Sequence, residues 1–200
     1  MQSKIVKDAL ILLAITMVAG LLLGLVFQIT KAPIAKAQEA SKMEAYKKLF
    51  SDASSFESVD TFNADDVAAY LDSTGKNYNN AVISEVAKAI NGSDVIGYVI
   101  TLTCKGDQGN ITYSTGIEID GTLRGYSITN IAETPGLGMK ATESDFSSQF
   151  VGKNVANLVS TKAEASSDDQ IVAISGATHT TDAIVNSMNA ALDYFNASLK

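Results

Sequence analysis

The sequence predicts an α+β domain carried on a single N-terminal transmembrane helix. Three observations predict it: an uncharged run at residues 9–30, four β-branched segments between residues 83 and 131, and an amphipathic pattern at the C-terminal end. Consecutive strands with short connections form antiparallel sheets, and helices that follow them cover one face. The expected architecture is therefore an antiparallel sheet domain with flanking helices, joined to one membrane anchor.

The apolar run at residues 9–30 is long enough to cross a bilayer. As a helix, its 22 residues span about 33 Å, against a hydrocarbon core of about 30 Å. A cleaved signal peptide is the alternative, because Ala35-Lys36-Ala37 has the small-x-small form of a cleavage site. The run exceeds the roughly 7–15 apolar residues usual in signal peptides, which favours a retained anchor.

The expected domain boundaries follow from this anchor. Residues 1–8 are interpreted as a short N-terminus before the membrane helix at 9–30, residues 31–50 as a linker and amphipathic helix, and residues 51–200 as the main domain. Lysines flank the run on both sides, so the positive-inside rule does not assign its orientation. Pro33 is expected to end the membrane helix, because proline lacks an amide donor and restricts the residue before it. The amphipathic helix is indicated by apolar residues at spacings of three and four, namely Met43, Tyr46, Leu49 and Phe50.

The sheet is expected between residues 83 and 131. The segments ISEVAKAI, VIGYVITLT, ITYSTGIEI and LRGYSITNI are separated by NGSD, CKGDQGN and DGT, which are turn signals. Asp120-Gly121 predicts a type I′ hairpin turn, whose two central positions both need positive φ. Residues 51–80 are polar and predict irregular structure with one short strand or helical turn.

Helices are expected to flank this sheet. Ser144 is a candidate cap for a short helix that buries Phe146 and Phe150. Residues 169–174, DQIVAI, predict a last strand. The C-terminal helix is expected from about Thr180, with one apolar face formed by Ile184, Met188, Leu192, Phe195 and Leu199.

Composition excludes several classes of function. Residues 31–200 contain thirteen basic and twenty-one acidic side chains. Their net charge of −8 repels nucleic acid. Cys104 is the only cysteine and His179 the only histidine, which excludes an intrachain disulfide and a histidine triad within the chain. No metal site and no catalytic residue are expected.

The stretch SGATHTT, residues 175–181, lies between the expected last strand and the C-terminal helix. The first amides of a helix are unpaired and carry positive partial charge, so they favour phosphate. Gly176 permits close approach to the backbone. Further donors come from four hydroxyls, those of Ser175, Thr178, Thr180 and Thr181. An ordinary N-cap needs only one hydroxyl, and the residues alone leave both capping and phosphate binding open.

Two motifs resemble those of the FMN-binding subunits of Rnf and sodium-pumping NADH:quinone oxidoreductase complexes. SGAT, residues 175–178, resembles the flavinylation motif before the C-terminal helix of that family. ETPGLG, residues 133–138, resembles the loop that lines the flavin. With one anchor and 200 residues, the chain is most similar to the G subunits of Rnf complexes, over essentially its whole length.

The resemblance implies covalently bound FMN, with its phosphate esterified to the hydroxyl of Thr178. Thr180 and Thr181 are the alternative attachment residues. Around the phosphate and the ring, the implied cofactor-binding residues are Ser175, Gly176, Ala177, Glu133, Thr134, Pro135, Gly136, Leu137, Gly138 and Lys140. The 133–138 loop would otherwise be an ordinary tight turn, and Lys140 an ordinary solvated lysine. Val172 departs from the family pattern. The flavin transferase of that family usually recognises an Asp three residues before the motif serine, which here is Ser175.

The function implied by the resemblance is that of an electron carrier in an ion-translocating ferredoxin:NAD oxidoreductase complex, without independent catalysis. Its partners would be the other membrane, flavin and iron–sulfur subunits and the lipid bilayer. The N-terminus would be cytoplasmic and the main domain extracytoplasmic. The alternative is a membrane-anchored, non-redox binding or assembly module of pilin-like type. That alternative explains the anchor and the sheet but not the pair of motifs.

Overall fold

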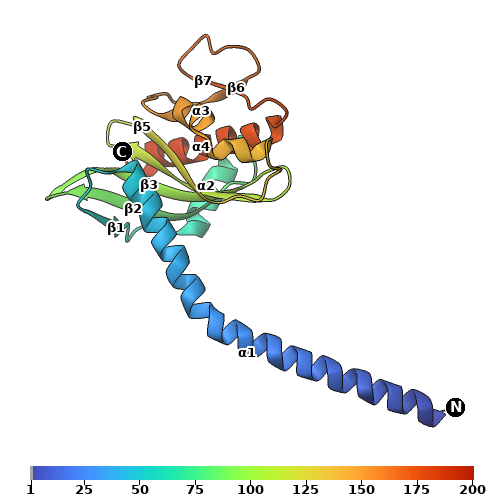
Figure 1. Cartoon of the computed structure of the whole chain (residues 1–200). Helices are drawn as coiled ribbons and strands as arrows, with labels where there is room; N and C mark the ends of the chain where they lie inside the picture. Colours follow the sequence, from blue (N-terminus) through green and yellow to red (C-terminus); the bar gives the residue numbers. More distant parts are fainter. Residues whose placement is uncertain (1) are drawn as a thin grey trace. The chain divides into compact units, whose positions relative to one another are not determined.

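The computed structural model describes residues 2–200 (Figure 1). The chain divides into two compact units, Met1–Ser41 and Lys42–Lys200. The first unit is purely helical, and the second contains the sheet domain together with the last turns of the long helix.

The long helix α1 runs without interruption from Gln2 to Leu49. The prediction that Pro33 ends the membrane helix, and that a linker follows it, is wrong, because Pro33 lies inside α1. Proline costs about 3 kcal/mol within a helix. Residues 31–48 consist mainly of Ala, Lys, Glu and Gln, which are strong helix formers and continue the helix across that position.

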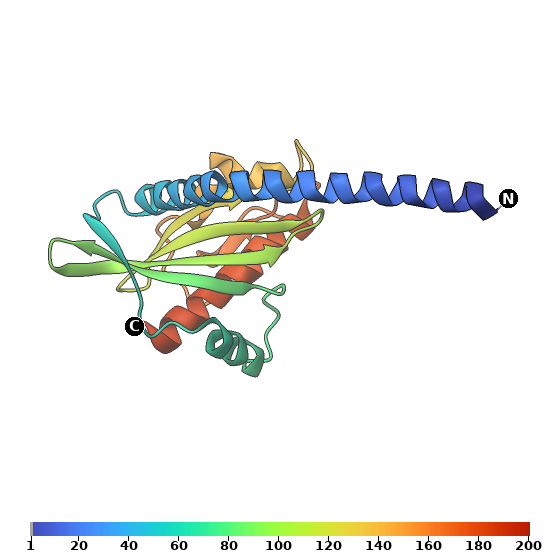
Figure 2. The ribbon, with the colours of Figure 1, turned by 90° about the horizontal axis from the view of Figure 1, so that it is seen from below.

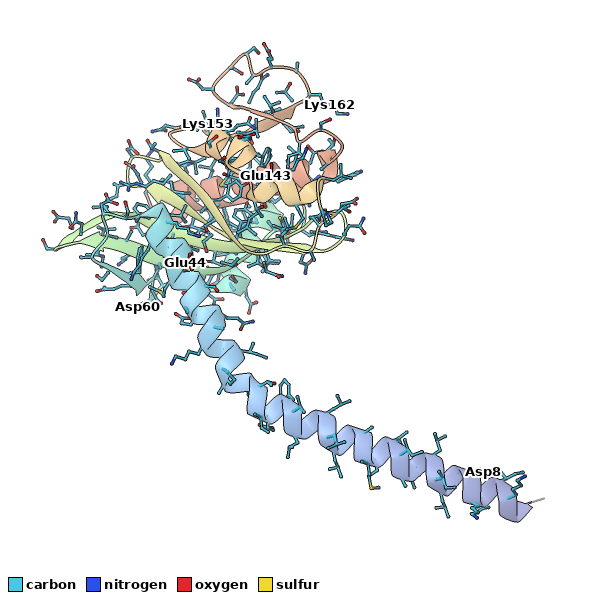
Figure 3. All side chains as sticks on the ribbon, viewed as in Figure 1. Asp8, Glu44, Asp60, Glu143, Lys153 and Lys162 are labelled. Carbon is cyan, nitrogen blue, oxygen red and sulfur yellow. The ribbon has the colours of Figure 1, made fainter. Side chains whose placement is uncertain are left out.

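The first unit presents a helix whose large apolar side chains are exposed. The segment Lys4–Leu49 contains an 18-residue window of mean hydropathy 2.8, long and apolar enough to cross a membrane. Leu12, Leu21 and Leu23 are 63–72% exposed, and side chains stand out all along α1 (Figure 3). Apolar surface of this extent requires a lipid environment or a partner helix.

The second unit is built on a five-stranded antiparallel sheet in the order β1-β2-β3-β4-β5. Its strands are β1 Ser55–Ser58, β2 Val82–Asn91, β3 Asp94–Lys105, β4 Asn110–Glu118 and β5 Leu123–Asn130. Spatial order equals chain order, so the sheet is a meander (Figure 2). The predicted antiparallel sheet and its four β-branched strands are confirmed.

The hairpin between β4 and β5 is not of type I′. Gly121 has a φ of 98°, whereas Asp120 is not among the residues with positive φ. The Gly121 amide donates to the Glu118 carbonyl at 2.9 Å, and the Glu118 amide donates to the Thr122 carbonyl at 2.8 Å. This pattern is a three-residue loop with glycine in a bulge. The Asp120 carboxylate accepts from the Thr122 amide at 2.8 Å, a local bond that favours this loop.

Residues 51–80 are more ordered than the sequence predicts. Besides β1 they contain α2, Ala64–Ser73, whose N-cap Asn63 accepts from the Asp65 amide at 3.0 Å. Val67 and Leu71, four residues apart, bury its apolar side. Because polar residues dominate this segment, its short amphipathic pattern is not evident from the sequence.

Helices and a small second sheet complete the unit. The C-terminal helix α4, Thr178–Ser198, crosses one face of the main sheet and buries Ile184, Met188, Leu192 and Phe195 as predicted (Figure 2). It begins two residues before Thr180. The expected last strand, β7 Gln170–Val172, pairs in parallel with β6 Val159–Thr161 and forms a separate two-stranded sheet.

The segment after β5 forms three short helical turns, η1 Gly138–Thr142, α3 Ser144–Ser147 and η2 Ser148–Phe150. Phe146 and Phe150 are buried, as predicted. Ser144 is not the cap: it is the first residue of α3, and Glu143 occupies the cap position without a side-chain hydrogen bond. The Glu143 carbonyl begins the turn by accepting from the amides of Phe146 and Ser147.

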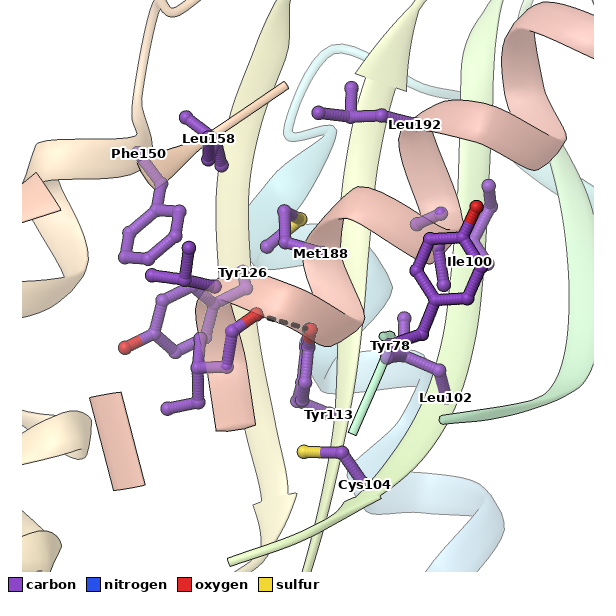
Figure 4. Close-up of a cluster of buried hydrophobic side chains, with 14 of the residues drawn as sticks. Tyr78, Ile100, Leu102, Cys104, Tyr113, Tyr126, Phe150, Leu158, Met188 and Leu192 are labelled. Carbon is purple, nitrogen blue, oxygen red and sulfur yellow. Dashed lines mark hydrogen bonds between the residues drawn. The ribbon is translucent and has the colours of Figure 1, made fainter. Parts of the chain in front are cut away.

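Two hydrophobic clusters lie on opposite faces of the main sheet. The larger one packs the sheet against α4 and includes Ile100, Leu102, Tyr113, Met188 and Leu192 (Figure 4). The smaller one packs Tyr46, Leu49 and Phe50, at the end of α1, against Ala87, Ala89 and Val99. The predicted apolar face of residues 43–50 therefore binds the sheet.

Phe50 fills a slot that two glycines leave open. A β-carbon at Gly97 would lie 2.6 Å from Phe50 Cζ, and one at Gly116 would lie 2.9 Å from Phe50 Cε2. The Arg124 guanidinium covers the ring at 4.6 Å from its centroid. The fully buried ring thereby fixes the last turn of α1 on the sheet.

We expect Phe50→Ala to lower the free energy of unfolding by about 3–5 kcal/mol, because it removes a buried aromatic ring and leaves a cavity. Chemical denaturation of the full chain in detergent, followed by circular dichroism, measures the change. Val82→Ala is the control: Val82 is 55% exposed, and its effect should stay within about 0.5 kcal/mol. Equal effects of the two substitutions would contradict the slot.

Candidate functional site

The ETPGLG loop and the SGAT stretch meet around one cavity. This cavity has a volume of about 90 Å³ and is lined by Asp107, Glu133, Thr134, Leu137, Gly138, Gly176, Ala177, Thr178, His179 and Thr180. Leu137 lies against Gly176: a β-carbon at that glycine would come within 3.0 Å of Leu137 Cδ2. Gly176 also has a φ of 79°, a conformation that favours glycine. The fold thus brings together the two motifs that the sequence singles out.

Glu133 connects three segments at this site. Its Oε1 accepts from the backbone amides of Asp107, at 2.8 Å, and Gln108, at 3.2 Å. Its Oε2 accepts from the Thr180 hydroxyl at 3.1 Å. Only 7% of the residue is exposed. The carboxylate therefore joins the β3–β4 connection, the 133–138 loop and the first turn of α4.

Two glycines leave the space that this carboxylate occupies. A β-carbon at Gly138 would lie 2.6 Å from Glu133 Oε2 and 2.7 Å from Thr180 Oγ1. A β-carbon at Gly106 would collide with Glu133 Oε1. Steric contacts as well as hydrogen bonds therefore hold the carboxylate in place. A side chain at Gly106 or Gly138 would displace Glu133.

The N-terminus of α4 presents unpaired amides at the cavity. The first helical hydrogen bond runs from the Thr181 amide to the Ala177 carbonyl at 3.0 Å, so the amides of Thr178, His179 and Thr180 precede it. Ala177 is the N-cap and provides no side-chain hydrogen bond. The capping alternative for the four hydroxyls is therefore wrong. Unpaired amides at the positive end of a helix are suited to an anion.

The four hydroxyls differ in what they bind. Thr181 Oγ1 accepts from the Ile174 amide and donates to the Ala177 carbonyl, both at 3.0 Å. Thr180 donates to Glu133. Ser175 is exposed, whereas Thr178 is half-buried and lines the 90 Å³ cavity. Within residues 2–200, the Thr178 hydroxyl makes no hydrogen bond, so it is the hydroxyl at the cavity that is available for reaction.

The remaining predicted residues lie around this cavity or apart from it. Lys140 and Ser175 line a neighbouring cavity of about 240 Å³, together with Glu143, Asp145 and Phe146. Val172 also lines it, with its amide held by Gln149 Oε1 at 2.7 Å. Pro135 and Gly136 are exposed and line neither cavity; Gly136 forms the turn with a φ of 75°. Thr181 faces the protein interior.

The β3–β4 connection also lines the site, although no sequence motif marks it. Asp107 lines the cavity, and Gly106, Asp107 and Gln108 surround Glu133. In the sequence, CKGDQGN indicates only a turn, and no pattern places it beside residues 133–138. Contacts between sequentially distant loops leave no local signal.

The nearby thiol is part of the core. Cys104 is 1% exposed, and burial raises the pKa of its thiol. Among the residues that the structure describes, no group of three His, Cys, Asp or Glu side chains is placed to hold a metal ion.

We expect Gly106→Ala to displace Glu133 and to lower the free energy of unfolding by about 1–3 kcal/mol, because the new methyl group competes for the space of the carboxylate. Gly109→Ala in the same connection is the matched control. Its β-carbon would lie 3.4 Å from Ala132 Cβ, an ordinary contact. Denaturation of both variants in detergent is the measurement. A Gly106→Ala protein as stable as the control would show that the carboxylate is not confined.

Comparison with known protein families gives two matches. The model of the FMN-binding domain matches residues 106–193, which include both motifs. The model of the RnfG N-terminal region matches residues 1–49, which correspond to α1.

Curated relatives match over nearly the whole chain. The G subunit of the ion-translocating oxidoreductase complex of Methanosarcina acetivorans is 32% identical over 98% of this chain and 97% of the relative. The G subunit of the Na⁺-translocating ferredoxin:NAD⁺ oxidoreductase complex of Acetobacterium woodii is 30% identical over 94% of this chain and 90% of the relative. Among solved structures, the C subunit of the Na⁺-translocating NADH-quinone reductase of Parabacteroides distasonis is 19% identical, with a TM-score of 0.49 over 74% of this chain and 80% of that one. From the two near-full-length relatives, the chain belongs to the family of G subunits of Rnf-type ion-translocating oxidoreductase complexes.

Proposed function

We propose that the chain is an electron-relay subunit of a membrane-bound, ion-translocating complex of the ferredoxin:NAD oxidoreductase type, with FMN joined through its phosphate to Thr178. One observation carries the attachment site. The Thr178 hydroxyl lines the cavity shared by both motifs and has no bond within the described chain, whereas Thr180 and Thr181 use their hydroxyls internally. This difference favours Thr178 over its two neighbours.

The attachment is a phosphoryl transfer. The Thr178 O–H bond would break and an Oγ–P bond would form, as the phosphoanhydride P–O bond of a flavin dinucleotide donor breaks and its other nucleotide leaves. That nucleotide takes the proton, so the chain gains the mass of FMN less one water. No electron is exchanged in this step, which requires a separate transferase.

The dimensions and donors of the cavity fit a phosphate group. Pockets that enclose a whole cofactor usually measure about 300–1,000 Å³, whereas this cavity measures about 90 Å³. The amides of Thr178, His179 and Thr180 provide hydrogen-bond donors at the positive end of α4. A flavin ring exceeds this volume and would lie largely outside, where Leu137, 42% exposed, offers an apolar surface.

FMN supplies the redox chemistry when bound, and the protein supplies position and electrostatics. Leu137 and Gly176 bring the two motifs into contact, and Glu133 holds the loop against α4. Lys140 lines the neighbouring cavity with Glu143 and Asp145, so its positive charge has acidic neighbours within the protein.

Residues 1–8 are proposed to be cytoplasmic, and residues 51–200 extracytoplasmic. In this arrangement, other membrane, flavin and iron–sulfur subunits bring electrons from reduced ferredoxin through the membrane to this domain, and further carriers return them toward NAD. A pilin-like module would not explain why two motifs that are distant in the sequence surround a threonine hydroxyl that makes no hydrogen bond within the described chain.

We expect Thr178→Val to abolish flavin attachment, because valine keeps the shape of threonine but lacks the nucleophilic oxygen. Intact mass and in-gel flavin fluorescence of the protein from its native host measure attachment. Thr178→Ser restores a hydroxyl at this position and should retain attachment, and Thr180→Val and Thr181→Val test the neighbouring sites. A flavin mass that persists in Thr178→Val would refute the assignment.

The orientation predicts selective labelling of intact cells by a membrane-impermeant amine reagent. Lys162 is exposed in the main domain, whereas Lys4 and Lys7 precede the apolar span. Peptides that contain Lys162 should carry the label before lysis, and those with Lys4 or Lys7 only after it. The reverse distribution, read by mass spectrometry, would place the main domain in the cytoplasm.

A further inference from the structure

A further cavity lies beside α2 and the C-terminal end of α4. It measures about 310 Å³ and is lined by Thr61, Asn63, Asp66, Val67, Tyr70, Tyr194 and Ser198. The helix α2 packs against α4 (Figure 2), and the Tyr70 hydroxyl donates to the Asp193 carbonyl at 3.4 Å. Tyr194 follows Thr178 by sixteen residues, which is about 24 Å along the helix axis. The cavity is therefore separate from the proposed attachment site.

Tyr194 is the buried polar residue of this cavity. It is 6% exposed, and Phe62 packs edge-to-face against its ring with the centroids 6.4 Å apart. Its hydroxyl makes no hydrogen bond within residues 2–200. Every fully buried side-chain nitrogen or oxygen in this part of the chain has a partner, so the Tyr194 oxygen is the atom that reaches the accessible surface of the cavity. It is left to bond the occupant of the cavity.

The charges around the cavity favour a cation. Asp66 is the one charged residue in the lining, and its exposed carboxylate makes no ion pair or hydrogen bond within the described chain. Ser198 ends α4, whose C-terminus carries negative partial charge and whose last turn contains no basic residue. The positive end of α2 also lies here, but Asp65 and Asp66 in its first turn exceed its partial charge of about half a unit.

The acceptors of the cavity match a primary ammonium group, which carries three donors and no acceptor. The Asp66 carboxylate, the Tyr194 oxygen and the Ser198 hydroxyl can all accept, and none has a partner within the described residues. The half-buried ring of Tyr70 adds a face that attracts cations. A divalent metal ion is a poorer match, because it requires several oxygen ligands and the lining provides one carboxylate.

We propose that this cavity binds a small primary alkylammonium compound. The ammonium group donates to the Asp66 carboxylate and to the Tyr194 oxygen, and the alkyl chain lies along the ring of Tyr70. The volume of about 310 Å³ is at the lower end of the roughly 300–1,000 Å³ usual for small-molecule pockets, so it suits a compact ligand. The net charge of −8 on residues 31–200 raises the local concentration of cations.

Titration of the full chain in a non-ionic detergent with butylammonium tests the site. Tyrosine labelled with ¹³C reports binding by NMR, and the signal missing from Tyr194→Phe identifies Tyr194. We expect butylammonium to shift this signal saturably. Butan-1-ol has the same length but no charge, and it should bind about tenfold more weakly, the ratio that corresponds to 1.4 kcal/mol. Equal affinities of the two compounds, or no saturable shift, would overturn the proposal.

Two variants test the named contacts. Asp66→Asn removes the negative charge and should weaken butylammonium binding at least fivefold. Asp72→Asn is the matched control, because Asp72 is exposed on the same helix, lies outside the lining and gives the same change in net charge. Its affinity should equal that of the unmodified chain. An equal loss in both variants would show unspecific attraction to an acidic surface and would refute the site.

Tyr194→Phe breaks no hydrogen bond within the described chain, so its unfolding temperature should not change. We expect it to weaken butylammonium binding at least fivefold, followed at the Tyr70 signal, because it removes one acceptor of the ammonium group. Unchanged affinity would refute the role of the hydroxyl and with it the proposal.

The ammonium site does not depend on the proposed flavin attachment. Intact mass reports the flavin in the same samples, and we expect Asp66→Asn and Tyr194→Phe to keep it. A flavin found on another residue together with saturable butylammonium binding would refute only the attachment site. An attached flavin without such binding would refute only the ammonium site.

Discussion

The carboxylate of Glu133 connects the three segments that form the proposed FMN site. A buried charge is costly unless hydrogen bonds replace the water it loses, and here two amides and one hydroxyl do so. The same bonds hold the 133–138 loop against α4, so that Leu137 reaches Gly176. The cavity beside Thr178 is consequently defined by contacts of the protein itself.

The helix α4 serves several parts of the domain at once. Its N-terminus provides unpaired amides at the cavity, and its apolar face buries Ile184, Met188 and Leu192 against the main sheet. Three polar side chains on another side of the helix bind Leu158, the strand β6 and the loop before β2, namely Asn189, Asp182 and Asp193. Because one rigid element carries all three contacts, the first turn of α4 keeps a fixed position relative to the main sheet and β6.

The sequence predicts those features that depend on local pattern. Alternating β-branched residues locate four strands, and the apolar spacing in residues 184–195 locates the face of α4 that the structure buries. The motifs 133–138 and 175–178 are visible because glycine, proline and hydroxyl residues cluster within a few positions.

The features that local pattern does not reveal depend on competition between interactions or on tertiary contacts. At Pro33 the strong helix formers that follow it outweigh the cost of the ring, so α1 continues. Glu133 has the sequence environment of an exposed loop residue, yet Gly106, Asp107 and Gln108 enclose it from a distant connection. Likewise, outside the resemblance of SGAT to a known motif, no local pattern separates Thr178 from Thr180. In the structure, Thr180 is buried and bonded to Glu133, whereas Thr178 is half-buried.

The proposed covalent link would resolve a conflict between electron transfer and retention of the cofactor. A relay needs a flavin that its partners can approach, but an exposed ring buries little surface and contributes little binding free energy. The domain also carries excess negative charge, which repels an anionic nucleotide at long range. The positive end of α4 offsets this repulsion only within its first turn. The proposed phosphoester to Thr178 would make retention independent of both the buried area and the ionic strength. The small cavity would then hold the phosphate alone and leave the ring accessible to redox partners.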